Sequence, residues 1–359
     1  MSAERTDVVV LGRGPAGLAT AIWLARAGRR VTVVGRAREL SAAVGEQLAA
    51  EGVRELSQLA PRLEPSRFGS PAPVTFSAWG ETALTARDEL FSPWGASCIV
   101  DRPQLEQALA EVACELGVGL LHDECVRAGA ADGIRVALSS GRLLSAAFVV
   151  DATGRSARLA RQLGAKILRT DSLVGLVGHL KPLHATRARN VMVESTTAGW
   201  WYSATVQDGS RVAVHFTDAD LLSRAGAAAA WRAALGESAH LPQHTVSLAC
   251  LCEVGVRPAW SQRLDRAAGS GWLAVGDAAM AWDPLSSSGL TNALLEARYA
   301  ASVIERVLDG AGECALAGYA ERVQHMFARY LAARERYYRA EQRYPDSPFW
   351  QRRQRRVTH

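Results

Sequence analysis

Lysine is almost absent from this chain. Of its 41 basic residues, only Lys166 and Lys181 are lysines, and all the others are arginines. The arginine guanidinium stays protonated and does not act as a nucleophile at neutral pH. The sequence therefore excludes most chemistry that depends on an activated lysine amine.

The chain also lacks long uncharged hydrophobic runs and a disulfide framework. No uncharged stretch reaches the roughly 18 residues of a membrane-spanning helix. Six cysteines are scattered over 359 residues, which is typical of reduced thiols in an intracellular protein. We therefore expect a cytoplasmic protein that does not engage a membrane.

The overall composition favours a folded protein with a sizeable core. Apolar residues make up 48% of the chain and charged residues 21%, and the length corresponds to about two domains. The net charge of +5 is small and is not concentrated in a basic arm. Nucleic acid is therefore not an expected partner.

The clearest motif comes directly after a short hydrophobic run. Residues 8–11 predict a buried parallel strand, and apolar residues at helical spacing follow over 18–25. Between them stands a fingerprint made up of Gly12, Gly14, Pro15, Ala16 and Gly17. In this strand–turn–helix context the glycines permit a tight turn, close approach of a pyrophosphate, and close helix–strand packing. The motif predicts one bound dinucleotide at the N-terminus of the helix.

The second strand of this unit departs from the usual dinucleotide pattern. It ends at Gly35, where an acidic residue commonly binds the ribose hydroxyls. For the next residue, Arg36, two interpretations stay open: contact with the adenine or a phosphate, or a solvated side chain. The later pair Gly310 and Gly312 follows a helical segment rather than a strand, so it predicts a helix-ending loop.

The remaining patterns predict an α/β fold. We expect a discontinuous Rossmann-like dinucleotide-binding domain, an inserted mixed β-sheet substrate domain and C-terminal helices. Helices are predicted over 103–116, 225–235, 289–308 and 315–343. The predicted ranges are 1–73, 101–166 and 265–310 for the dinucleotide-binding domain, 74–100 and 167–264 for the substrate domain, and 311–359 for the C-terminal helical region.

Several motifs, taken in order, carry a resemblance to a known group. After the fingerprint come Gly45-Glu46, Asp101-Arg102, the run from Asp151 to Arg155, and Gly276-Asp277. Together they resemble the FAD-dependent aromatic hydroxylases and the related flavin-dependent halogenases. The resemblance implies that FAD is the bound dinucleotide and that the inserted domain lies over its flavin. It also implies FAD contacts from Arg102, Gly276, Asp277, Pro284, Gly289, Leu290 and Asn292.

A narrower resemblance rests on four segments. They are 199–204, 217–221, 283–290 and 344–353, and they are similar to the LodB, GoxB and QhpG flavoproteins. That group hydroxylates a tryptophan of a partner polypeptide during maturation of quinone cofactors. The resemblance implies an FAD-dependent monooxygenase that uses O2, with NAD(P)H or a partner reductase as electron donor.

Candidate catalytic residues lie mainly in the inserted domain. Trp200, Trp201 and Tyr202 occupy one predicted strand, so alternate rings should face opposite sides of the sheet. One face could form the wall of an aromatic pocket, or the rings could be ordinary core. His215 is a candidate for proton handling, and Pro284 is expected beside the flavin.

Three further features of the sequence bear on its chemistry. Asp218 and Asp220 are also candidates for proton handling, although a helix cap is the favoured interpretation of Asp218. No metal site is expected, because the spacing of His240, His244, Cys250 and Cys252 does not suit zinc. The basic run from Arg352 to Arg356 is interpreted as a solvated end or as a docking element for an acidic partner.

The scarcity of lysine distinguishes halogenation from hydroxylation as the possible reaction. Resemblance to the halogenases requires a lysine between Gly45-Glu46 and Asp101-Arg102, and this segment contains none. Tryptophan hydroxylation is therefore favoured over halogenation. A small-molecule indole monooxygenase of natural-product biosynthesis and a non-catalytic maturation factor stay as alternatives.

Overall fold

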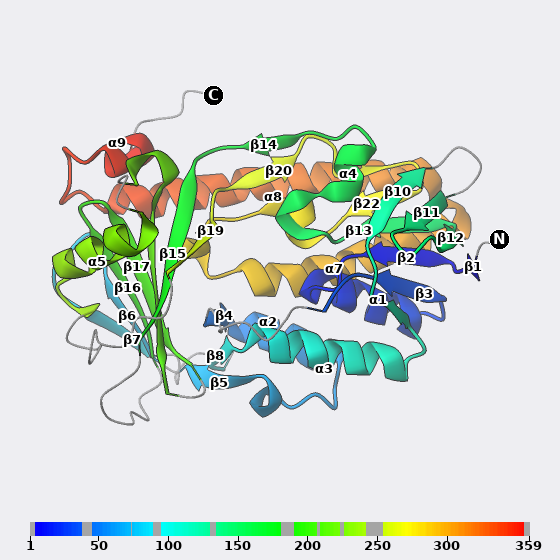
Figure 1. Cartoon of the computed structure of the whole chain (residues 1–359), viewed down its shortest axis with the longest axis horizontal. Helices are drawn as coiled ribbons and strands as arrows, with labels where there is room; N and C mark the ends of the chain where they lie inside the picture. The colour runs from blue at the N-terminus through cyan, green and yellow to red at the C-terminus, as the bar shows by residue number, and fades with distance from the viewer. Residues whose placement is uncertain are drawn as a thin grey trace.

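The computed structural model describes residues 4–37, 45–72, 74–88, 95–129, 134–180, 190–206, 209–222, 226–241 and 254–354. Two large sheets lie at opposite ends of the molecule, and the long helix α8 (Gly312–Ala340) runs past both (Figure 1). Within the described ranges, no helix is both long and apolar enough to cross a membrane.

The first large sheet has six strands, of which five are parallel. Its central strands are short apolar runs buried along their whole length, as expected of a parallel sheet covered by helices. In spatial order they are β21 (Ala268–Gly269), β22 (Trp272–Ala274), β13 (Phe148–Asp151), β2 (Val8–Leu11), β3 (Val31–Val34) and β9 (Gly119–Leu121). The sheet is thus assembled from separate parts of the chain.

Helices cover this sheet close to the predicted positions. The helix α1 (Pro15–Arg26) joins β2 to β3, and it packs against α3 (Arg102–Glu115) and α7 (Gly289–Arg306). The Asp101 side chain caps α3 by accepting a hydrogen bond from the backbone N of Gln104 at 3.2 Å, so the helix begins one residue before Pro103. Between α7 and α8 the chain forms a π-helical turn, η7 (Val307–Ala311), with a kink at Gly310, whose φ is 101°. The helix direction therefore changes near the predicted place, but the predicted helix-ending loop is wrong, because the turn leads directly into α8.

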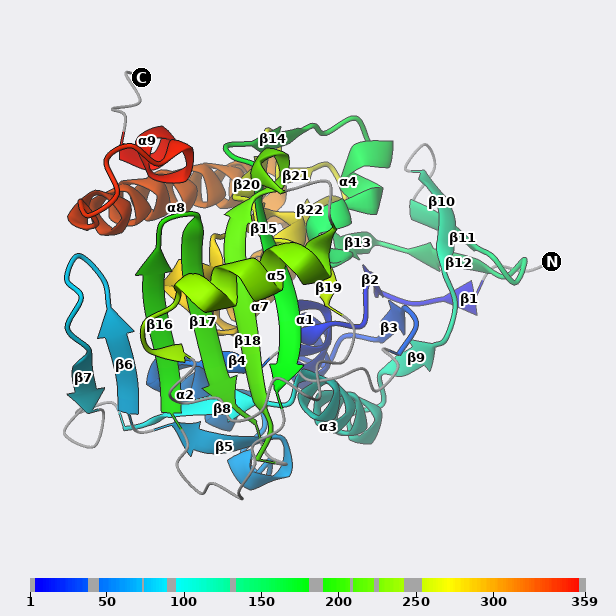
Figure 2. The same cartoon turned by 60° about the vertical axis from the view of Figure 1, so that its left-hand side comes forward.

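The second large sheet has seven strands and is mixed, because only β6 and β16 pair in parallel. In order the strands are β19 (Gly255–Pro258), β15 (Leu173–Leu180), β18 (Arg211–Asp218), β17 (Gly199–Thr205), β16 (Asn190–Thr196), β6 (Val74–Ala78) and β7 (Thr85–Asp88). The helix α5 (Ala227–Glu237) covers one face (Figure 2). The other face packs on the end of α8 and on α9 (Pro348–Gln354).

Smaller elements join these layers. Short sheets are formed by β4 (Glu46–Leu48), β8 (Ser97–Val100) and β5 (Gly69–Ala72); by β14 (Ile167–Arg169), β20 (Gln262–Leu264) and β23 (Met280–Ala281); and by β1 (Glu4–Arg5), β12 (Leu143–Ala146), β11 (Ile134–Leu138) and β10 (Cys125–Gly129). Two further helices are α2 (Ala50–Leu59) and α4 (Arg158–Gln162). Strands β8, β14 and β20 therefore pair outside the seven-stranded sheet, although their residues fall in the predicted substrate domain.

Candidate flavin and substrate site

Two glycines of the fingerprint have no room for a side chain. A Cβ added to Gly12 would lie 2.1 Å from the carbonyl oxygen of Ala152, and Gly12 has a φ of 120°. A Cβ added to Gly17 would lie 2.1 Å from the carbonyl oxygen of Gly12. These contacts hold the turn and α1 tightly against the end of β13, so the first and third glycines do what the motif predicts.

The second glycine, by contrast, has room for a Cβ. Gly14 is the N-cap of α1 and makes no side-chain cap hydrogen bond, and Pro15 follows in the first turn. The nearest atoms to a Cβ added at Gly14 would be Nη2 of Arg102 and Oε1 of Glu106, each at 3.9 Å. The uncapped start of α1 therefore lies close to an arginine side chain, an arrangement suited to binding a phosphate group.

Arg102 is held between two carboxylates. Its Nη1 lies 2.9 Å from Oε1 of Glu46, and its Nε lies 2.8 Å from Oε1 of Glu106. Burial alone would lower the pKa of Arg102, but Glu46, Glu106 and Asp277 together raise it above the ordinary value. The second carboxylate oxygen of Glu46 is buried and has no partner among the described residues. This oxygen could therefore accept a hydrogen bond from a ligand.

The turn at Gly276 brings a distant segment against the fingerprint. A Cβ added to Gly276 would lie 2.7 Å from Cβ of Ala16, in the first turn of α1. The next side chain, Asp277, is 45% exposed and lies 3.8 Å from Nε of Arg155. The structure thus brings together the two motifs that the sequence places more than half the chain apart.

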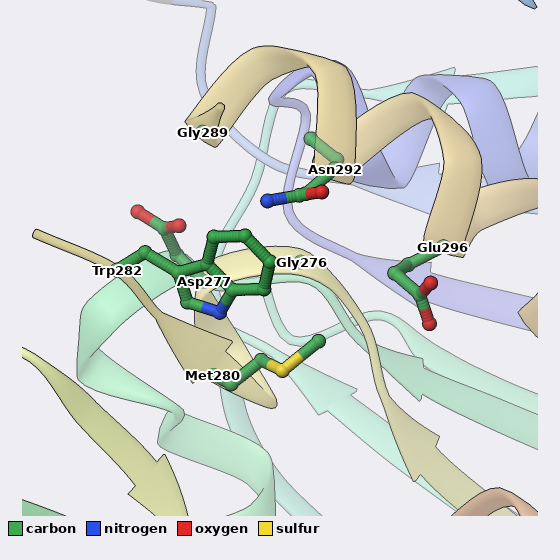
Figure 3. Close-up of a pocket in the computed structure, with 8 residues that line it drawn as sticks. Gly276, Asp277, Met280, Trp282, Gly289, Asn292 and Glu296 are labelled. Carbon is green, nitrogen blue, oxygen red and sulfur yellow. The ribbon is translucent and has the colours of Figure 1, made fainter. Parts of the chain in front are cut away.

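A pocket lies between this turn and the start of α7 (Figure 3). Asn292 of α7 faces Trp282 across it, and the side-chain Nδ2 of Asn292 is buried without a partner among the described residues. A Cβ added to Gly289, the first residue of α7, would meet nothing within 4 Å. Leu290 points into the core and is 6% exposed, so only its backbone can face a ligand.

The segment before α7 is fixed by a buried carboxylate. Asp283 is 1% exposed; its Oδ1 accepts a hydrogen bond from the backbone N of Leu285, and its Oδ2 accepts from Nε of Arg334 and from Oη of Tyr338. Pro284, next in the chain, begins the short turn η6 (Pro284–Ser286) and is half-buried. These bonds anchor the Pro284 turn to α8.

The strand β17 places its aromatic rings on alternate faces, as predicted. Trp200 and Tyr202 lie on the face that packs against α8 and α9, and Trp201 lies on the other face. Trp200 stacks on Phe216 at 4.1 Å and donates a hydrogen bond from Nε1 to Oη of Tyr338. Tyr202 donates from Oη to the carbonyl oxygen of Gly45 at 2.5 Å. Trp200 is thus a core residue, linked to Asp283 through Tyr338.

Trp201 and His215 do not lie on that face. Both are buried on the side of the sheet that α5 covers, where Trp201 packs edge-on against Trp231 and lies 4.9 Å from His215. Burial lowers the pKa of His215 to about 4, so its ring is neutral at neutral pH. Because the sheet separates them from the pocket at α7, we leave these two residues out of the proposed site.

Three other expectations meet different surroundings. Nε of Arg36, an exposed side chain, lies 3.3 Å from Oε1 of Glu124. Asp218 makes no cap hydrogen bond and instead pairs with Arg353 at 2.6 Å and Arg352 at 3.0 Å. The expected helix cap is therefore wrong, and these two arginines are bound within the chain rather than solvated.

Metal binding has no support in the part of the chain that the structure describes. No group of three or more potential ligands occurs there. His240 contacts the carbonyl oxygen of Thr82 through Nε2 at 2.8 Å. His244, Cys250 and Cys252 lie outside the described residues.

Two residues at this site were not singled out from the sequence. Arg155 donates to the carbonyl oxygens of Trp260 and Trp282, at 2.5 Å and 3.2 Å, and so ties the Asp277 turn to its neighbours. Asp283 anchors the Pro284 turn. Both stand inside motifs that carry the family resemblance, but sequence spacing cannot identify their partners.

Comparison with known proteins agrees with this geometry. Residues 79–359 match the family model described as tryptophan halogenase. The chain is 28% identical to the putative FAD-dependent oxidoreductase LodB of Marinomonas mediterranea, over 98% of this chain and 97% of LodB.

Solved structures extend the comparison. QhpG, a peptidyl tryptophan dihydroxylase essential for tryptophylquinone cofactor biogenesis, is 30% identical, with a TM-score of 0.83, over 98% of this chain and 79% of QhpG. The myxobacterial chondrochloren halogenase CndH shares the fold, with a TM-score of 0.87 at 22% identity, over 99% of this chain and 87% of CndH. These matches confirm the resemblance seen in the motifs: the chain belongs to the tryptophan halogenase family, within the superfamily of FAD-dependent halogenases and hydroxylases.

Proposed function

We propose that this protein is an FAD-dependent monooxygenase that hydroxylates a tryptophan residue of a partner polypeptide during maturation of a quinone cofactor. One observation carries the proposal. An intact dinucleotide cradle occurs in a chain that is 30% identical to a peptidyl tryptophan dihydroxylase and has no lysine between residues 46 and 101.

The described residues fit FAD. The start of α1 and Arg102 would hold its pyrophosphate, Asp277 would hold the ribityl chain, and the start of α7 would face the flavin ring. When bound, FAD supplies the reduction and activation of O2 that amino-acid side chains lack. NAD(P)H or a partner reductase is the proposed electron donor.

The chain's own groups would position and stabilise this cofactor. The N-terminal end of α7 carries a partial positive charge and would stabilise negative charge on the ring. The side-chain Nδ2 of Asn292, which has no hydrogen-bond partner among the described residues, is a donor at the same place. Asp283, anchored by Arg334 and Tyr338, would keep the Pro284 turn in a fixed position beside the ring.

The missing lysine supports oxygen insertion over halogenation. Lys166 is exposed, and its backbone N donates to Oδ1 of Asp265, in the segment between α4 and β14. Lys181 lies outside the described residues. Neither falls within the segment where the related halogenases place their catalytic amine.

Intact-mass analysis of the partner polypeptide tests the proposal. The FAD-loaded protein is incubated with a candidate tryptophan-containing partner polypeptide, O2, and NADH, NADPH or a reductase. We expect a gain of one or more oxygen atoms on tryptophan. Replacement of hydrogen by halogen would restore the halogenase alternative, and oxygenation of free tryptophan alone would favour the small-molecule monooxygenase. A protein that fails to bind FAD would contradict the whole proposal.

A further inference from the structure

A second, larger cavity lies beside the Pro284 turn. It is an open groove of about 620 Å³ between residues 282–288 and one face of α8, and we call it the α8 groove. Trp282 borders both this groove and the pocket at the start of α7. Its indole stacks on Tyr330 at 4.7 Å, with 11° between the ring planes. The groove therefore adjoins the segment proposed to lie beside the flavin.

The α8 wall of this groove is basic and partly apolar. Arg329 and Arg336 are exposed, and neither makes an ion pair with any described residue. Between them Ala332 and Ala333 leave a shallow floor, and Tyr337 is 63% exposed at one end. By contrast, Arg334 is already held between Asp171 and Asp283. The groove thus offers two free guanidinium groups around a surface of small and aromatic side chains.

The spacing of the two arginines limits what can occupy the groove. Seven residues along a helix place them about 10 Å apart on the same side of α8. A free amino acid has one carboxylate and would engage only one of them. An extended polypeptide advances about 3.3 Å per residue, so acidic side chains two to four residues apart would reach both. Trp282, on the wall shared with the pocket at α7, and Tyr337, next to Arg336 at the end of the groove, add aromatic surface that an indole can contact.

We propose that the α8 groove binds an extended, acidic segment of the polypeptide substrate and so delivers its tryptophan to the flavin site. This inference rests on the proposed function, because it assumes that the substrate is a polypeptide. Charge complementarity sets the class of partner, because two arginines that form no ion pair within the described ranges favour a segment rich in Asp and Glu.

Binding of a labelled peptide tests the α8 groove directly. The probe is a short fluorescein-labelled synthetic peptide in which one tryptophan is flanked by glutamates, and its control carries glutamines in their place. Fluorescence anisotropy is recorded with the full-length, FAD-loaded protein at low salt. We expect the double variant Arg329→Glu/Arg336→Glu to bind the acidic peptide roughly tenfold more weakly, and Tyr337→Ala to weaken it as well.

A matched variant controls for net charge. Arg62→Glu/Arg232→Glu makes the same change at two exposed arginines that do not line the groove, and it should bind as the wild type does. Unchanged binding by the groove variant, or equal binding of the glutamine peptide, would overturn the inference. A change only in self-association, measured by sedimentation, would instead identify the groove as an interface between copies of this chain.

The same variants separate this inference from the proposed function. If the groove variant hydroxylates the partner polypeptide with unchanged KM, the groove inference fails and the proposed function stands. If the wild type binds the acidic peptide through the groove but oxygenates no polypeptide, the binding site stands and the proposed function fails.

Discussion

At the scale of single residues, the three glycines of the fingerprint differ in why a side chain is absent. Gly12 and Gly17 are required by contacts within the protein, because a methyl group at either would overlap a backbone carbonyl. Gly14 meets no such contact. The fold gives no steric reason for a glycine at this position, whereas the proposed approach of the FAD pyrophosphate does.

This difference predicts opposite outcomes for two alanine variants. Gly12→Ala combines a clash with a positive φ, so we expect it to lower the free energy of unfolding by about 3 kcal/mol or more. Gly14→Ala should leave the stability of the FAD-free protein almost unchanged, while weakening FAD binding by about tenfold. Urea unfolding and FAD titration measure the two effects. Normal FAD affinity in Gly14→Ala would contradict the proposed approach of the FAD pyrophosphate to Gly14.

His215 predicts a dependence of stability on pH. Its folded pKa of about 4 lies below its ordinary value of 6.5, so the unfolded state binds more protons between these values. Its contribution is fully present above pH 6.5 and is lost as the pH falls toward 4, by about 3 kcal/mol in total. We expect His215→Gln to flatten the stability curve in this window. An identical pH profile for the variant and the wild type would show that the ring is not desolvated.

At the scale of elements, the short helix α9 closes the seven-stranded sheet. It seats Trp350 and Phe349 in the core and places Arg353 against Asp218, where both side chains are almost completely buried. Arg352, on the same turn, is 43% exposed. The first two arginines of the run expected to be solvated or to dock a partner are therefore part of the fold, and Arg355 and Arg356 lie outside the described residues.

The two arginines of α9 should contribute unequally to stability. Arg353→Ala removes the buried ion-pair partner of the Asp218 carboxylate and leaves it only the pair with Arg352. We expect this change to lower the free energy of unfolding by about 3 kcal/mol. Arg352→Ala removes an exposed partner and should cost less than about 1 kcal/mol. Chemical denaturation compares the two, and equal losses would contradict the assigned roles.

Elements and motifs differ in how far the sequence can predict them. The strand–turn–helix at Gly12 depends on neighbouring residues, so its pattern could be recognised directly. The alternation of Trp200 and Trp201 also follows from strand geometry. Which face meets the flavin side does not, because it is set by the packing of α5 and α8 on the sheet. The sequence alone therefore could not show that Trp201 and His215, both candidate site residues, lie on the face of the sheet that α5 covers.

At the scale of the whole molecule, α8 joins the two large sheets. Oη of Tyr319 donates to the carbonyl oxygen of Ala274 in β22. Oη of Tyr330 accepts a hydrogen bond from the backbone N of Asp283, and Oη of Tyr338 lies between Asp283 and Trp200 of β17. One helix thus contacts the parallel sheet, the Pro284 turn and the inserted sheet.

A deletion within α8 tests this connection. Removing Ala320, one residue after Tyr319, would rotate everything beyond it by about 100° relative to Tyr319. We expect loss of FAD binding together with a large drop in thermal stability, whereas substitution of the same residue by serine should be tolerated. Retention of bound FAD by the deletion variant would show that the three tyrosine contacts are not needed together.

The hydroxyls of Tyr319, Tyr330 and Tyr338, three of the four tyrosines of α8, also restrict how this chain can diverge. Loops between the strands can gain or lose residues without disturbing the layers, since they end at the surface. The stretch from Tyr319 to Tyr338 cannot, because each hydroxyl must meet its own partner at a fixed rise and rotation along one helix. Homologues that keep this arrangement should therefore vary in amino-acid identity along α8 while conserving its length.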